Sequence, residues 1–597
     1  MRRQPPRGRR AEDGILRRGR GLAAGVLLAA GLLLAAGILS VSWLPEGLVG
    51  LWGSARAEAD RTLILTADGS PEAVRSRLRG SVQTLFAPGV WDLRAVSLEM
   101  PGQEVLLLGE ERTEVRPGEA ADLTAFLNRK TLIRDGQGRS IATMVIRRGS
   151  PLPALFLTVD PERLSAVRRS QEEKIDAGQL TVREADGSLG YRGSISLFRG
   201  RGNSTFAYQK KPFELKVPEK IGPAGLPGGK TWVLLANYTD LSLLRNQLAL
   251  DTAREIGLPC AVRCAQADLW INGDYQGLYL LTEKVQIKKN RVSIRDLEEE
   301  NEALLSADPA SYPRFKKAWG NLAEIRGYEL PADPEDVTGG YIAKIEKDHR
   351  YGNTAKPGFQ TQGRLCVRII EPTCPSLREV QYLAERVDEA MGALLAKDGI
   401  HPETGKGWQE YLDAESFALK FLLEEWCKNF DFLGGSQYFY KDSDAVDPLI
   451  YAGPAWDYDL AFGNMTSRGF EPRGNYMTTQ SRRPGNLYWV LYGQEAFRRE
   501  TGLLWRQRFR PAMAILLGET ADGGGRALKS LAEYAEEIRD SAGMNFERWG
   551  AATEAAAAAG TNFDSALRYL EKWIRIRVDF MDGENGGGEN TEEIQSP

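Results

Sequence analysis

The spacing of apolar residues changes along this chain, and the change predicts two differently built parts. Between residues 160 and 300, short alternating apolar and polar runs end in turn sequences, which is typical of strands joined by hairpins. One helix interrupts these strands within residues 239–257, where apolar residues recur at helical spacing up to Gly257. From about residue 375 amphipathic helices dominate, with two or three strands inserted within 424–464. We therefore predict an α+β fold, with a β-rich lobe followed by a helical lobe.

The first 44 residues differ from the rest of the chain. Residues 1–20 carry eight arginines against two acids, and the 24 residues of 21–44 contain no charge. A helix of that length spans a hydrocarbon core of about 30 Å. We predict that 21–44 is a transmembrane signal anchor, that the basic segment stays in the cytoplasm, and that the bulk of the chain is extracytoplasmic. The alternative is a signal peptide cleaved near Ala55-Arg56-Ala57, which would make the protein secreted.

The remaining chain divides into four predicted segments. Residues 58–150 hold short alternating runs punctuated by Gly and Pro, which predicts a small β-rich extracytoplasmic domain. The two lobes occupy residues 151–515. A helical extension follows at 516–580, and the polar, glycine-rich stretch 581–597 is predicted to be a disordered tail.

Scarce histidine and cysteine narrow the chemistry that this chain can perform. It has two histidines in loop-like sequences, and its five cysteines form no Cys-x-x-Cys pair. Ser-His-Asp catalysis and metal sites built from His or Cys are therefore disfavoured. The net charge of −4 gives no indication of nucleic-acid binding. Phosphoryl transfer assisted by Mg²⁺ or Mn²⁺, or hydrolysis by a carboxylate pair, remains.

Three aspartates and one glutamine form the strongest candidate site. Asp431 is followed six residues later by Gln437, and Asp457 and Asp459 come after a strand-like run. Residues two apart share a face of an extended strand, so the last two acids can act together. Phosphoryl transfer needs one carboxylate near the acceptor hydroxyl and further oxygen ligands for a divalent cation. The alternative is that these acids only cap turns.

A glycine- and arginine-rich turn is the second candidate. The run "FRGRGNSTFAYQKKPFELKV" places Arg199 and Gly202 between two strand-like stretches, where backbone N–H groups can approach phosphates. Lys216 lies on the following strand and is expected to reach a phosphate, although Lys211 competes for this role. The alternative is a plain hairpin with basic edges. Further on, "GLYLLTE" ends an apolar strand at Glu283, where a kinase-like plan puts the connection between lobes. The alternative, which the pattern alone favours, is a strand that ends in solvated charges.

Five blocks occur in an order that resembles a known family. They are "FRGRGNSTFAYQKKPFELKV", "LLRNQLALDTAREIG", "LWINGDYQGLYLLTEKV", "KNFDFLGGSQYFYKD" and "PAWDYDLAFG". Together they resemble the CotH family of spore-coat and cell-surface proteins, which are similar to atypical secretory-pathway kinases. The resemblance covers roughly residues 150–515. It implies an atypical protein-kinase-like two-lobed fold and a Ser/Thr protein kinase that uses ATP with Mg²⁺ or Mn²⁺, acting on a spore-coat or envelope protein.

The resemblance also implies roles for single residues. Asp431 resembles the catalytic acid, and Asp457 resembles the metal-binding acid, with Asp459 beside it. Gln437 stands where the family usually has Asn, so its carbonyl would reach a metal from one methylene further away. Arg245 and Asn246 match an L-R-N block and are expected to be structural. The implied nucleotide-binding residues are Arg199, Gly202, Asn203, Lys216 and Glu283.

Three functions remain open on the sequence alone. The first is a membrane-anchored CotH-type kinase. The second is a catalytically inactive CotH-like scaffold in spore-coat or envelope assembly, favoured by Gln437 and by the scarcity of ATP outside the cell. The third is a glycosidase that uses Asp431 with Asp457 or Asp459, which requires acids about 5–10 Å apart along a sugar groove.

Overall fold

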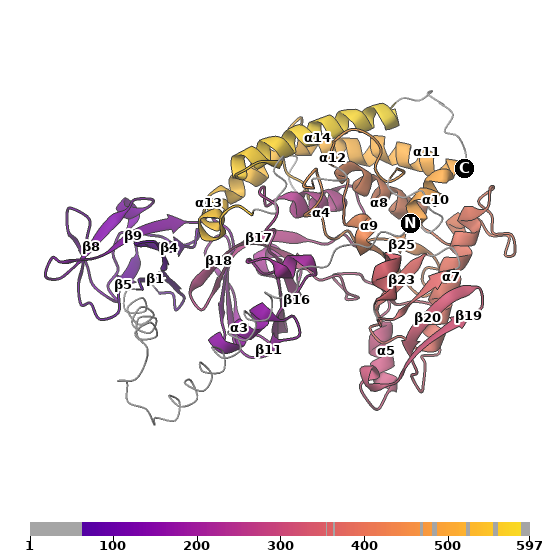
Figure 1. Ribbon diagram of the computed structural model, residues 1–597, viewed down its shortest axis with the longest axis horizontal. Helices are drawn as coiled ribbons and strands as arrows, with labels where there is room; N and C mark the ends of the chain where they lie inside the picture. The colour runs from indigo at the N-terminus through magenta and orange to yellow at the C-terminus, as the bar shows by residue number, and fades with distance from the viewer. Residues whose placement is uncertain are drawn as a thin grey trace, which may run out of the picture. The chain divides into compact units, whose positions relative to one another are not determined.

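The computed structural model (Figure 1) describes most of the chain beyond its N-terminal segment. The predicted basic segment and the predicted transmembrane helix at 21–44 lie outside the described residues. Within the part that is described, no helix combines the length and the apolar composition needed to cross a membrane. The described residues are 62–67, 69–353, 355–361, 365–465, 470–479, 486–520, 526–552 and 559–586.

Residues 63–150 form two small sheets. One has the strand order β2-β1-β5 and is antiparallel, and the other has the order β3-β4-β9-β8-β6-β7, in which β4 and β9 are parallel. Buried and partly exposed residues alternate along β8, as expected for a strand with one face on a core. The strands are β1 (Ile64–Ala67), β2 (Ala73–Arg75), β3 (Arg77–Arg79), β4 (Val82–Ala87), β5 (Val96–Glu99), β6 (Leu106–Leu108), β7 (Thr113–Val115), β8 (Thr131–Asp135) and β9 (Ser140–Arg148).

A nine-stranded sheet follows, with the order β11-β14-β15-β16-β18-β17-β10-β12-β13. Its pairs are antiparallel except β10 with β17. Helix α3 (Pro161–Arg169) follows its first strand, and α4 (Arg245–Glu255) lies within the range predicted for the inserted helix. The strands are β10 (Ala154–Thr158), β11 (Lys174–Ile175), β12 (Gln179–Arg183), β13 (Leu189–Ser194), β14 (Leu197–Gly200), β15 (Phe213–Ile221), β16 (Gly229–Leu235), β17 (Cys264–Ile271) and β18 (Asp274–Glu283).

An antiparallel seven-stranded sheet combines strands from both parts of the sequence. Its order is β19-β20-β22-β23-β21-β24-β25, so the two strands inserted among the helices join five earlier ones. The short helices α5 (Leu297–Leu304) and α6 (Asp348–Gly352) flank these strands. The strands are β19 (Arg314–Trp319), β20 (Leu322–Tyr328), β21 (Tyr341–Glu346), β22 (Gly358–Thr361), β23 (Cys366–Glu371), β24 (Gln437–Lys441) and β25 (Ile450–Ala452).

The C-terminal part is helical, as predicted. Helix α8 is buried on nearly all sides, and the long helix α14 packs against it and against α11, α12 and α13 (Figure 1). The prediction of a mixed α+β chain with a β-rich N-terminal part and a helical C-terminal part is therefore confirmed. The helices are α7 (Leu377–Leu395), α8 (Ala414–Cys427), α9 (Phe432–Gly435), α10 (Leu487–Gly493), α11 (Glu495–Leu504), the π-helical turn Trp505–Phe509, α12 (Arg510–Leu516), α13 (Leu531–Trp549) and α14 (Phe563–Gly586).

Candidate functional site

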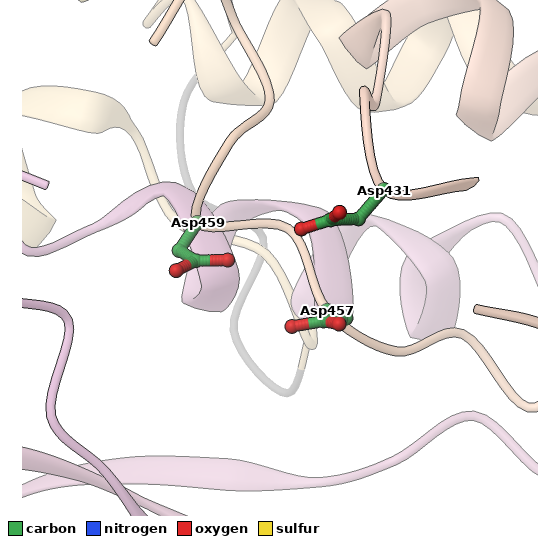
Figure 2. Close-up of side chains that lie close together, drawn as sticks. All are labelled: Asp431, Asp457 and Asp459. Atoms are coloured by element: carbon green, nitrogen blue, oxygen red, sulfur yellow. The ribbon is translucent and has the colours of Figure 1, made fainter. Parts of the chain in front are cut away.

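The three aspartates singled out from the sequence converge. Asp431 precedes α9, whereas Asp457 and Asp459 lie on the segment that follows β25, so two separate stretches of chain supply them (Figure 2). One carboxylate oxygen from each lies within 4.8 Å of the others. Carboxylate oxygens in such a group are suitable ligands for a hard divalent cation.

Asp431 is placed by the end of helix α8 and by a buried asparagine. Helix α8 ends at Cys427, and the next residue, Lys428, turns the chain through the left-handed region with φ 47° and ψ 52°. The side-chain carbonyl of Asn429 then accepts a hydrogen bond from Asp431 N at 3.1 Å, and its amide donates to Asp457 O at 3.0 Å. A single fully buried amide therefore holds the backbone of Asp431 beside that of Asp457.

Asp457 and Asp459 are directed by the tyrosine between them. Tyr458 is fully buried, its hydroxyl donates to Glu424 Oε1 at 2.6 Å, and its backbone N–H donates to Asn246 Oδ1 at 2.7 Å. Because Tyr458 is anchored in the core, the backbone positions of Asp457 and Asp459 on either side of it are fixed, and both side chains belong to the same carboxylate group. Asp457 itself takes a left-handed backbone, with φ 75°, and accepts a hydrogen bond from Ser436 Oγ at 3.1 Å.

Burial and the neighbouring carboxylates raise the pKa of two of the three aspartates, Asp431 and Asp459. Burial, followed by the negative charge of Asp457, raises the pKa of Asp431 to about 6, against the opposing effect of Arg350 and Lys347. Burial, followed by the charges of Asp457 and Asp431, raises the pKa of Asp459 well above its ordinary value. A bound cation would stabilise this cluster, because its positive charge offsets the repulsion between the carboxylates.

The aspartates lie in a polar cleft that also contains three cationic side chains. The cleft has an empty volume of about 1080 Å³, its solvent-open mouth included, and Arg201, Lys344 and Arg350 contribute to its lining. The guanidinium of Arg201 lies 5.4 Å from the ring centre of Trp456. Lys344 Nζ donates to Gly435 O at 2.9 Å and lies 2.9 Å from a carboxylate oxygen of Glu346. The cleft therefore has anionic and cationic groups side by side.

Two of the predicted nucleotide-binding residues line this cleft, namely Gly202 and Asn203. Gly202 has φ 96°, and a Cβ on it would lie 2.3 Å from Thr205 Oγ1, so this turn requires glycine. Its carbonyl accepts a hydrogen bond from Gln171 Nε2 at 2.7 Å, which ties the turn to residues outside the cleft.

The other three predicted nucleotide-binding residues are not among the lining residues. Arg199 forms an ion pair with Glu214, with 2.7 Å between Nη2 and Oε2. Glu283 is buried and forms an ion pair with Arg291, with 2.6 Å between Oε1 and Nη1. Lys216 is exposed on β15. The competing Lys211 instead donates to Phe206 O at 2.6 Å.

Gln437 is also placed away from the cleft lining. It is the first residue of β24 and is buried, and its Nε2 donates to Phe432 O at 3.1 Å. Its Oε1 has no hydrogen-bond partner among the described residues. The side chain of Gln437 is therefore hydrogen-bonded to the backbone of α9, the short helix that follows Asp431.

The sequence analysis missed most of the cationic side of the cleft, whereas it expected Asn246, which supports the acids, to be structural. Lys344 and Arg350 come from β21 and α6, where no motif was recognised. Arg201 stood inside the quoted glycine-rich turn and was not chosen as a site residue. Asn246 belonged to the matched L-R-N block, and its bond to Tyr458 N explains why an amide is needed there.

Comparison with protein-family models matches this chain to the CotH kinase protein family over residues 198–351 and 385–581. The match covers more than half of the chain and includes all three aspartates of the cluster. It also continues through α13 and most of α14, beyond residue 515, where the sequence resemblance ended. A search of curated proteins finds no match. The chain belongs to the CotH kinase protein family.

Proposed function

We propose that this protein is an atypical kinase that transfers the γ-phosphate of ATP to Ser or Thr hydroxyls of envelope or spore-coat proteins. In this proposal residues 21–44 anchor it in the membrane, and a kinase-like pair of lobes works outside the cytoplasm. The observation that carries the proposal is the grouping of three carboxylates within 4.8 Å in a cleft that also presents cationic side chains. Phosphoryl transfer requires both kinds of group around one phosphate.

Asp457 and Asp459 are the residues that would hold a divalent cation, Mg²⁺ or Mn²⁺. The donor set fits, because both are carboxylates and because the pKa of Asp459 is raised by burial and by neighbouring acids. When bound, the cation neutralises charge on the phosphate oxygens. Family membership implies ATP and divalent-metal use in general, and the choice between the two metals is part of the proposal.

Asp431 is the proposed acceptor-activating acid. With a pKa of about 6 it is ionised at neutral pH, so it can accept a hydrogen bond from the substrate hydroxyl. During transfer the hydroxyl oxygen forms a bond to the γ-phosphorus, the bond from that phosphorus to ADP breaks, and the hydroxyl proton passes to Asp431. Arg201, Lys344 and Arg350 supply positive charge for the phosphoryl oxygens.

A catalytically inactive scaffold in spore-coat or envelope assembly is the second candidate, and Gln437 favours it. A kinase of this plan uses an amide carbonyl or an acid near this position to complete the metal ligands. Here Gln437 does not line the cleft: its Nε2 donates to Phe432 O, and its Oε1, the atom that would bind a metal, has no hydrogen-bond partner among the described residues. A metal site with only the aspartates as protein ligands would have to complete its coordination with water and phosphate oxygens.

The deciding experiment is a thermal-shift titration of the full-length protein with ATP and Mg²⁺ or Mn²⁺. Binding to the folded state raises the melting temperature by mass action. We expect a shift for the wild type and for Asp176→Asn, a control at an exposed aspartate that pairs with Arg163, and no shift for Asp457→Asn. Transfer from labelled ATP should be lost in Asp431→Asn. A folded wild type with no shift in either metal would support the scaffold.

A further inference from the structure

We propose that the C-terminal helix α14 is a positioning element of the catalytic cleft. It acts through Arg577 on residues 471–477, and through these on the loop that carries Asp431. The inference rests on the proposed kinase function, and it assigns to the end of the chain a role beyond covering the core.

Arg577 is fully buried, and its guanidinium donates to Glu425 of α8 and to residues 472 and 474. Its Nη1 donates to Pro472 O at 3.0 Å and to Gly474 O at 2.9 Å. Its Nη2 donates to Glu425 O at 2.6 Å and pairs with the carboxylate of Glu425. One guanidinium thus ties α14 to both the end of α8 and a loop beyond the acid cluster.

Lys428, the residue that follows helix α8, binds the same loop. Its Nζ donates to Glu471 O at 2.8 Å and to Arg473 O at 2.5 Å. Together with the two bonds from Arg577, four successive backbone carbonyls of residues 471–474 alternately accept from two cations. Such a pattern fixes the path of a backbone segment, which apolar packing alone leaves less defined.

Glu425 holds the next residues of the same segment. Its two carboxylate oxygens accept hydrogen bonds from Tyr476 N at 2.7 Å and from Met477 N at 2.6 Å. Because Arg577 pairs with this carboxylate, the guanidinium also fixes the group that receives these N–H bonds. Residues 471–477 are therefore held by Arg577, Lys428 and Glu425 acting as one unit.

One hydroxyl group connects residues 471–477 to the acid cluster. Tyr476 is buried, and its OH donates to Asn429 O at 3.1 Å. Asn429 is the residue whose amide joins Asp431 N to Asp457 O. A continuous set of bonds therefore runs from α14 to the two backbone positions that set the separation of the acids.

Tyr476→Phe tests this link in the full-length protein, because it removes only the hydroxyl and keeps the buried ring. The matched control is Tyr534→Phe, a buried tyrosine of α13 whose OH donates to Asp251 at 2.8 Å, outside the cleft. Titration with Mn²⁺ followed by calorimetry gives metal affinity, and steady-state kinetics gives kcat and KM for ATP.

We expect Tyr476→Phe to weaken Mn²⁺ binding and to lower kcat by about three- to tenfold each, as the loss of one hydrogen bond predicts. The KM for ATP should stay within about twofold, since the residue does not touch the nucleotide. Arg577→Lys should show larger losses of the same kind, because an ammonium cannot reproduce the paired bonds of the guanidinium. Tyr534→Phe should match the wild type.

The outcomes separate this inference from the function on which it rests. Equal Mn²⁺ affinity and kcat in Tyr476→Phe and the wild type would overturn the inference and leave the kinase proposal intact. Equal losses in Tyr476→Phe and Tyr534→Phe would also overturn it, since a general loss of stability would then explain both. A folded wild type that binds neither Mn²⁺ nor ATP would overturn the kinase proposal and this inference together.

Discussion

Replacing Asp431 by asparagine is expected to stabilise the metal-free protein, although it removes the proposed catalytic acid. Burial and the charge of Asp457 raise the pKa of Asp431 from 3.8 to about 6. At about 1.36 kcal/mol per pKa unit, the ionised carboxylate costs the folded state about 3 kcal/mol at neutral pH. Burying the polar amide of asparagine also costs some desolvation free energy. We therefore expect the substitution to raise the free energy of unfolding by about 1–2 kcal/mol.

The gain should depend on pH in a defined direction. The folded pKa of Asp431 lies above its unfolded value, so the folded state binds the proton more tightly. Wild-type stability contributed by this group is therefore fully present below a pH of about 4 and is lost as the pH rises to about 6. Urea unfolding in a chelator at a pH of about 7.5 should favour the asparagine variant, and the difference should disappear at a pH of about 4.

Adding Mn²⁺ at neutral pH should reverse the order of the two proteins. A cation at a hundred times its dissociation constant stabilises a folded state by about 2.7 kcal/mol, and the variant has lost one of the three carboxylates that attract it. The reasoning is refuted if the variant is less stable than the wild type in chelator at neutral pH. It is refuted as well if the difference in unfolding free energy is the same at both pH values.

Two further predictions concern the reaction itself. Phosphate transfer, measured as kcat/KM, should rise with pH through about 6 as Asp431 loses its proton, and a rate that falls over this range would contradict its role as proton acceptor. Lys344→Met should weaken ATP binding, because Lys344 lines the cleft, whereas Lys216→Met should leave it unchanged, because Lys216 is exposed on β15. The opposite result in a binding titration would restore Lys216 as the phosphate lysine.

The acidic side of the cleft was predictable because its information is local. Asp457 and Asp459 are two residues apart, and Asp431 stands in a short block that the family resemblance identifies. The cationic side was not, because it depends on strand pairing between distant residues. Lys344 reaches the cleft on β21, which pairs with β24 so that Tyr341 lies opposite Lys441. No periodicity in the sequence specifies that register.

The position of Lys216 outside the cleft lining has a related cause. The alternating pattern of β15 correctly predicts a strand, but alternation does not say which face looks toward a ligand. Glu214 and Lys216 share one face, and Glu214 is taken up by ion pairs with Arg199 and Lys284 at 2.7 and 3.0 Å. These pairs also explain why Arg199 is absent from the cleft lining. Charges that look available in a sequence often neutralise each other on a neighbouring strand.

Three asparagine side chains bind the backbone of the acid cluster, and the electrostatics of the cluster explain why. Asn429 joins Asp431 N to Asp457 O, Asn246 accepts from Tyr458 N, and Asn464 Nδ2 donates to Asp459 O at 2.7 Å. A carboxylate at any of these places would add a fourth negative charge to a cluster in which neighbouring acids already raise the pKa of Asp431 and Asp459. A lysine would pair with the aspartates and occupy the space of the cation. An amide donates and accepts without net charge, so it can fix the acids in place and leave their charge for a ligand.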